Sequence, residues 1–67
     1  MVKGIMCKKI TKNGEEKVIF KVKGDNCIRN AKAILNNLEQ VDGEYFVMYV
    51  LSNNKEEWIC VDSGEPT

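Results

Sequence analysis

The dipeptide Asn13-Gly14 constrains the fold of this chain more than any other feature, because it lies between two segments that alternate apolar and polar residues. A two-residue type I′ turn needs positive φ at both central positions, and Asn-Gly adopts that conformation at little cost. We therefore predict a β-hairpin that joins residues 4–12 to residues 15–23.

In the register that this turn imposes, the hairpin has one apolar face and one basic face. Cys7 lies opposite Phe20 and Lys8 lies opposite Ile19, and opposed residues share a face. The apolar face collects Ile5, Cys7, Val18, Phe20 and Val22, with Lys9 near the turn. The basic face carries Lys8, Lys17, Lys21 and Lys23, with Met6, Ile10 and Ile19 between them.

After Gly24 the spacing of apolar residues becomes helical. Asp25 is placed to cap the first turn, and residues 41–43 (Val-Asp-Gly) end the segment. Spacings of three, four and seven draw one apolar stripe from Cys27, Ile28, Ala31, Ile34, Leu35 and Leu38. The pattern predicts an amphipathic helix that buries one face.

A second hairpin is predicted from the aromatic and β-branched segment 44–51, a turn at Asn53-Asn54 and a strand over 56–62. The expected register places Phe46 opposite Val61 and Met48 opposite Ile59, on the face beneath the helix. Tyr45, Val47, Tyr49, Trp58 and Cys60 then fall on the other face.

Together these elements predict an α+β fold, a two-layer ββαββ sandwich in which one helix covers one face of a four-stranded antiparallel sheet. The strand orders 2-1-3-4 and 1-2-4-3 both keep all neighbours antiparallel. We favour 2-1-3-4, because the segment 44–51 is apolar on both faces and belongs in the interior of a sheet. Residues 1–62 form the expected single domain, and residues 63–67 an expected frayed tail.

The charges divide unevenly along a chain whose net charge is zero. Residues 1–23 hold seven lysines and two glutamates, a net +5, and residues 24–67 hold three basic and eight acidic residues, a net −5. Such an asymmetry creates local fields that steer partners and does not by itself fix a fold.

The residues that usually carry catalysis are scarce. The chain has no histidine, so a cysteine or serine nucleophile lacks its usual base and zinc lacks its commonest nitrogen ligand. Neither a GxxxxGK nor a GxGxxG phosphate loop is present. We therefore expect a protein that is not an enzyme and needs no cofactor or metal. An enzyme with a cysteine nucleophile is the alternative.

Three cysteines at wide spacing suit neither a secreted disulfide scaffold nor a CxxC metal site. We expect reduced, buried thiols at Cys7, Cys27 and Cys60, with a Cys7–Cys27 disulfide as the less favoured alternative. No stretch is apolar enough for a membrane span, and the N-terminal residues lack the pattern of a secretion signal. These features favour a cytoplasmic protein.

The sheet face opposite the helix combines basic and aromatic residues and is the predicted partner-binding surface. Its candidate residues are Lys8, Lys17, Ile19, Lys21, Tyr45, Tyr49 and Trp58. Tyrosine and tryptophan are common interface anchors and lysines speed encounter, so we expect a small protein-binding module. Single-stranded nucleic acid and a second copy of the chain are the alternative partners for the same face. Alternating lysines are also typical of a solvated strand face.

A small domain rich in lysine and asparagine and poor in catalytic groups is similar in general style to accessory proteins of phages and mobile elements that bind and inhibit a host factor. The resemblance implies an inhibitor or regulator and assigns no site residue.

Overall fold

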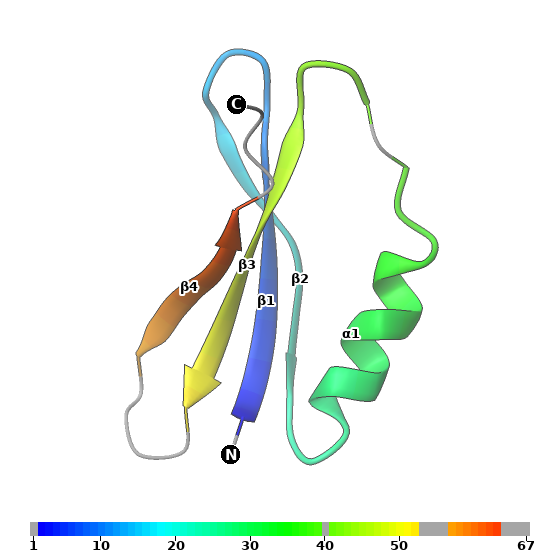
Figure 1. Cartoon of the computed structure of the whole chain (residues 1–67), viewed down its shortest axis with the longest axis vertical. Coiled ribbons are helices and arrows are strands. Elements are labelled where there is room, and N and C mark those ends of the chain that lie inside the picture. Colours follow the sequence, from blue (N-terminus) through cyan, green and yellow to red (C-terminus); the bar gives the residue numbers. More distant parts are fainter. Residues whose placement is uncertain (1, 40, 53–56, 64–67) are drawn as a thin grey trace.

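The computed structural model describes residues 2–39, 41–52 and 57–63. Five elements follow one another along the chain: β1 (Val2–Ile10), β2 (Glu16–Lys23), α1 (Cys27–Leu35), β3 (Tyr45–Ser52) and β4 (Trp58–Ser63). The strands form one antiparallel sheet of order β2-β1-β3-β4, and α1 packs against one face of it (Figure 1). The predicted ββαββ sandwich and its favoured strand order are confirmed.

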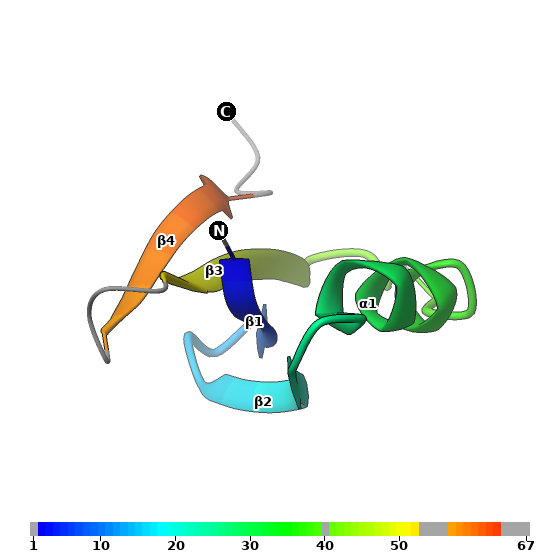
Figure 2. The same ribbon diagram turned by 90° about the horizontal axis from the view of Figure 1, so that it is seen from below.

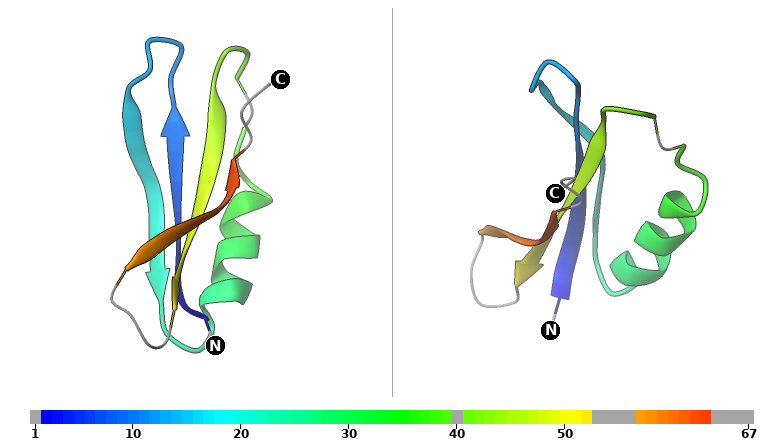
Figure 3. Two further views of the ribbon diagram at one scale, coloured as in Figure 1. Left: turned by 60° about the vertical axis from the view of Figure 1, so that its left-hand side comes forward. Right: turned by 45° about the horizontal axis from the view of Figure 1, so that its top comes forward.

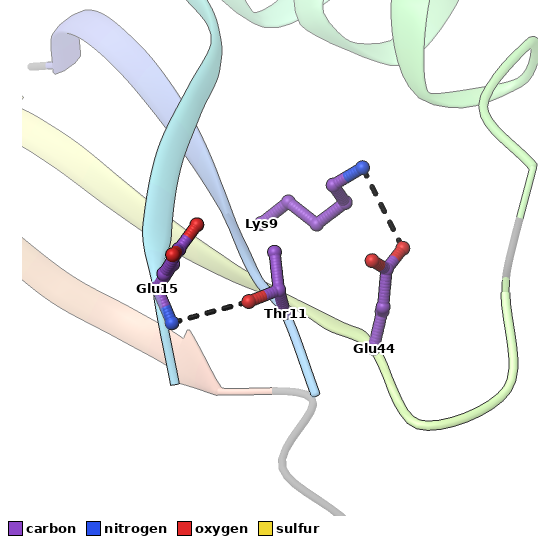
Figure 4. Close-up of polar contacts among 4 residues, drawn as sticks. All are labelled: Lys9, Thr11, Glu15 and Glu44. Atoms are coloured by element: carbon purple, nitrogen blue, oxygen red, sulfur yellow. Dashed lines mark hydrogen bonds and ion pairs between the residues drawn. The ribbon is translucent and has the colours of Figure 1, made fainter. Parts of the chain in front are cut away.

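The first hairpin forms, but its turn differs from the predicted type I′ turn. The amide of Gly14 donates to the carbonyl of Thr11 at 2.9 Å, and the amide of Thr11 donates to the carbonyl of Glu15 at 2.9 Å. The Glu15 amide also donates to Thr11 Oγ1 at 3.1 Å (Figure 4). Gly14 has a φ of 83°, whereas no described residue other than glycine has a positive φ. The loop is therefore the three-residue kind, in which a type I turn is followed by a left-handed glycine.

The longer loop moves the register by one residue, and a β-bulge at Ile19 moves it back. Near the turn Lys8 lies opposite Val18, whereas beyond the bulge Cys7 lies opposite Phe20 as predicted. The expected pairing of Lys8 with Ile19 is wrong, because Ile19 is the extra residue of the bulge and packs against the core.

Two further side chains change face because they lie between the longer loop and this bulge. Lys17 lies opposite Lys9, on the side of the sheet that α1 covers. Val18 lies on the opposite side, where it is 57% exposed, and the prediction that it faces the core is wrong. A one-residue slip inverts the faces of a strand, which accounts for both corrections.

The core lies between α1 and the first two strands. Its buried centre consists of Cys7, Phe20 and Ala31, one residue each from β1, β2 and α1. Partly buried residues from three strands and the helical segment surround it: Ile5, Ile19, Val22, Ile34, Leu35, Leu38, Phe46 and Met48. The predicted apolar stripe of the helix is confirmed except for Ile28, which is exposed.

The helix begins and ends within the predicted segment. Asn26 occupies the N-cap position and its side chain makes no capping hydrogen bond, so the expected cap at Asp25 is wrong. After Leu35 the chain continues in a tighter turn, in which the amide of Leu38 donates to the carbonyl of Leu35 at 3.2 Å. This turn keeps Leu38 against the core after α1 has ended.

An ion pair ties the connection between α1 and β3 to the sheet. Lys9 Nζ lies 3.5 Å from Glu44 Oε1 (Figure 4). The two side chains are 28% and 19% exposed, so solvent screens this pair less than a fully exposed one. Glu44 thereby compensates the charge of Lys9, which the sequence places on the otherwise apolar face.

The last strand departs furthest from prediction. β4 pairs with β3 through Tyr49–Cys60 and Leu51–Trp58, and a bulge at Val61 follows. This register is shifted by two residues from the expected one. A shift of two keeps the side chains before the bulge on their predicted face of the sheet, but their predicted cross-strand partners are wrong. The predicted turn at Asn53-Asn54 lies outside the described residues. β4 extends to Ser63, so the expected tail begins inside a strand, and residues 64–67 lie outside the described part.

The sheet twists so strongly at its end that β4 lies across the side remote from α1 (Figures 2 and 3). Ile59 and Val61 are consequently 46% and 57% exposed. The prediction that they pack beneath the helix is wrong. We use the name open face for the side of the sheet away from α1, which carries Gly4, Met6, Lys8, Ile10, Glu16, Val18, Lys21, Lys23, Tyr45, Val47, Tyr49, Leu51, Trp58 and Cys60.

Candidate interaction surface

Two lysines of the open face lie above aromatic rings. Lys8 Nζ is 5.1 Å from the ring centroid of Tyr49, on the neighbouring strand β3. Lys8 is paired with Val47, so the contact with Tyr49 is a diagonal one, two residues further along β3. Cation–π contacts at exposed sites are worth roughly 0.5 to 1 kcal/mol, which is enough to favour one position of a flexible ammonium group.

The second pair joins the two edge strands. Lys21 Nζ on β2 is 5.4 Å from the ring centroid of Trp58 on β4, although β1 and β3 lie between these strands in the sheet order. The contact is made because β4 lies across the open face (Figure 3). The terminal atom of the indole ring, Cη2, lies 3.0 Å from where a β-carbon would stand at Gly4. Because glycine has no β-carbon, position 4 leaves room for the ring of Trp58.

Beneath these pairs the open face has an apolar floor. Met6, Ile10, Val47 and Leu51 are buried, with at most 9% of each residue exposed. Tyr45, Tyr49 and Trp58 are half-buried. From the sequence alone we expected this apolar surface to be exposed. Strand β4 and the aromatic rings cover part of it, so less apolar area is left for a partner.

The rim of the open face is basic apart from Glu16, which lies opposite Ile10. Lys8 Nζ lies 4.0 Å from Glu16 Oε2, and because the Glu16 side chain is 58% exposed this pair contributes little to stability. Lys21 and Lys23 are exposed, and neither forms an ion pair with a carboxylate of the described residues. Their ammonium groups remain available to carboxylates of another molecule.

Five of the seven predicted partner-binding residues lie together on the open face: Lys8, Lys21, Tyr45, Tyr49 and Trp58. Lys17 and Ile19 do not, because the longer loop turns Lys17 to the helix side and the bulge packs Ile19 against the core. Sequence reasoning missed Val18 as an exposed apolar residue of this face and Gly4 as the residue that contacts the ring of Trp58. The presence of a glycine in the predicted strand 4–12 is the signal that could have indicated such a close approach.

The cysteines divide into two buried thiols and one exposed thiol, all of them free. The burial expected of Cys7 and Cys27 is confirmed and that of Cys60 is wrong. Burial raises the pKa of the Cys7 thiol, which keeps it in the unreactive neutral form. The Cys27 thiol approaches the carbonyl oxygen of Val2 at 3.8 Å. Neither buried cysteine is placed as a nucleophile.

Among residues 2–39, 41–52 and 57–63, no three histidine, cysteine, aspartate or glutamate side chains gather as metal ligands would. The helix in this described part is too short and too polar to cross a membrane.

Comparisons of the chain with protein-family models, with curated proteins and with solved structures find no match.

Proposed function

We propose that this chain is a small non-enzymatic protein-binding module that engages a partner protein through the open face and acts on it as an inhibitor or regulator. The observation that carries the proposal is the pair of lysine–aromatic contacts, Lys8 with Tyr49 and Lys21 with Trp58. Each places a cation beside a half-buried ring on one surface. Binding loses less side-chain entropy when such groups are held in place beforehand.

A protein partner suits this arrangement better than single-stranded nucleic acid does. Bases stack on free ring faces, whereas Lys8 and Lys21 already lie above the rings of Tyr49 and Trp58. A base would have to displace an ammonium group at each position. The zero net charge also gives weak overall attraction to a phosphate backbone. A protein segment with carboxylates beside apolar side chains can use the ammonium groups where they are.

A homodimer through the open face remains the alternative with a physical motive, because Val18 is an exposed apolar side chain on that surface. Strand β4 already covers part of the apolar surface, which weakens this physical reason for dimerisation. Sedimentation at several concentrations tests self-association directly, and a strict monomer would leave the heterologous partner as the remaining protein candidate.

The proposal includes a cytoplasmic location. Two of the three free thiols, Cys7 and Cys27, are buried as ordinary small apolar residues are. Reduced cysteines of this kind suit a reducing compartment.

The test compares two double variants that each remove two positive charges. Lys8→Gln with Lys21→Gln alters the open face, whereas Lys17→Gln with Lys32→Gln alters exposed lysines on the helix side of the sheet and on α1. Quantitative affinity capture from the source organism identifies partners, and titration of the purified partner then gives the dissociation constant.

We expect the open-face variant to bind at least about tenfold more weakly and the control to bind as the wild type does. Equal binding by both variants would show that the open face is not the interface. A labelled single-stranded oligonucleotide is titrated in parallel. Tight binding to it that falls with salt at about −0.7 per neutralised phosphate would replace the protein partner with nucleic acid.

A further inference from the structure

Strand β4 contributes none of the buried apolar side chains in the described part of the chain. All of those residues come from the other four elements. β3 is the only element with which β4 makes extensive contacts, whereas α1 packs on β1 and β2. The other edge strand differs, because β2 places Phe20 in the centre of the core. The two edges of the sheet are therefore attached with unequal strength.

Apart from the β3 ladder, Trp58 supplies two contacts that hold β4 over the open face. Its ring rests on Gly4 of β1 and lies under the ammonium group of Lys21 on β2. The other side of the strand faces solvent, where Ile59 and Val61 are largely exposed. One side chain at the beginning of β4 thus fastens the strand across the sheet.

The surface beside this contact is apolar. Trp58 lies opposite Leu51, which is 8% exposed, and Lys21 lies opposite Met6, which is 7% exposed. Release of Trp58 would uncover the backbone at Gly4 and remove the cross-strand neighbour of Leu51. The α1 side of the sheet, with its own buried centre at Cys7, Phe20 and Ala31, would keep its packing.

We propose that β4 is a strap that opens locally while β1, β2, β3 and α1 remain folded, and that Trp58 is its latch. Sub-global opening of this kind occurs where a segment has few buried contacts of its own. The open form loses the Lys21–Trp58 contact, so if the protein-binding function proposed above holds, the partner binds the closed form and opening of β4 lowers the apparent affinity. This effect on binding rests on the proposed function, whereas the opening itself does not.

Native-state hydrogen exchange of the isolated chain tests the opening without any partner. The amides compared are those that bond β4 to β3 and those that bond β2 to β1, because both sets belong to edge strands. We expect the β4 set to be at least about tenfold less protected than the β2 set. Equal protection of the two sets would overturn the proposal, because β4 would then open only with the whole domain.

Two alanine variants identify the latch. Trp58→Ala is expected to lower the protection of the β4 set by a further factor of about ten and to leave the β2 set within about threefold of its value in the wild type. Ile59→Ala is the matched control on the same strand, because its side chain is exposed, and we expect little change in either set. If Trp58→Ala lowers protection equally throughout the sheet, Trp58 is part of the global core and the latch is refuted. The failure of either exchange test would leave the partner-capture test of the open face unaffected.

Discussion

Replacing neighbouring residues Val18 and Ile19 by alanine distinguishes the bulged hairpin from a regular one. In a regular hairpin Val18 would face the core and Ile19 would face solvent. With the bulge, Val18 is 57% exposed and Ile19 packs against the core. We expect Val18→Ala to change the free energy of unfolding by no more than about 0.5 kcal/mol, as surface substitutions usually do.

The expected cost of Ile19→Ala is larger. Truncating a fully buried isoleucine costs about 2 to 5 kcal/mol, and because Ile19 is half-buried we expect about 1 to 3 kcal/mol. A domain of 67 residues has a total stability of roughly 3 to 10 kcal/mol, so this loss is a substantial part of it. Each kcal/mol lowers the melting temperature by about 4 to 8 °C in a domain of this size.

Urea unfolding followed by far-ultraviolet circular dichroism measures both free energies, and the slope with urea concentration should stay the same in both variants. Trp58 fluorescence is less suitable as the main signal, because it reports on β4 alone. A larger loss for Val18→Ala than for Ile19→Ala would refute the bulge and with it the placement of Lys17 on the helix side.

Four further predictions concern the packing and the charges. Gly4→Ala brings a β-carbon to 3.0 Å from both Trp58 Cη2 and the carbonyl oxygen of Val22 and should cost about 1 to 3 kcal/mol in chemical unfolding. In a Trp58→Ala background the cost should be smaller but should persist, because the contact with Val22 remains. In the native protein Cys60 should react with a thiol reagent and Cys7 should not until the chain unfolds; comparable rates would contradict their assigned burial. Burial raises the pKa of the Cys7 thiol. The contribution of the neutral thiol to stability is therefore complete below the unfolded pKa of about 8.5 and is lost as pH rises through the folded pKa. Cys7→Ala should flatten the dependence of stability on pH above about 8.5. Lys9→Met removes a half-buried ion pair, and its cost should shrink with added salt, whereas a cost that does not change with salt would assign the effect to packing.

The elements of this fold are readable from local patterns in the sequence. Alternation on both sides of Asn13-Gly14 predicts the first hairpin, and the change to helical spacing after Gly24 predicts α1. The strand order also follows, because a segment that is apolar on both faces needs a neighbour on each side. These signals are local, so they survive errors in the detail of each turn.

The faces of the strands were less predictable, because they depend on single-residue shifts. Asn13-Gly14 suits both a two-residue and a three-residue loop, and the two loops give registers that differ by one residue. The bulge at Ile19 then restores the pairing of Cys7 with Phe20. No local signal at Ile19 marks this bulge. It satisfies the core beneath α1, which only forms when distant segments meet.

The candidate surface shows the same division. The aromatic and basic residue types are visible in the sequence, and alternation groups most of them correctly, including Lys21, Tyr49 and Trp58. The cover that β4 provides over this surface could not be predicted from the sequence. It depends on the twist of β3 and β4 and on a contact between Trp58 and Gly4, which lie at opposite ends of the chain.

The sequence by itself therefore determined which segments become strands and helix, their order in the sheet, and the separation of a core under α1 from a basic and aromatic face. Hydrophobic periodicity is sufficient for these features, because it records which side of each element must leave water. The tertiary structure decided the bulges at Ile19 and Val61, the exposure of Val18 and the position of β4 across the open face. Their physical reason is long-range packing, since the best fit beneath α1 and on Gly4 selects among registers that are equally acceptable locally.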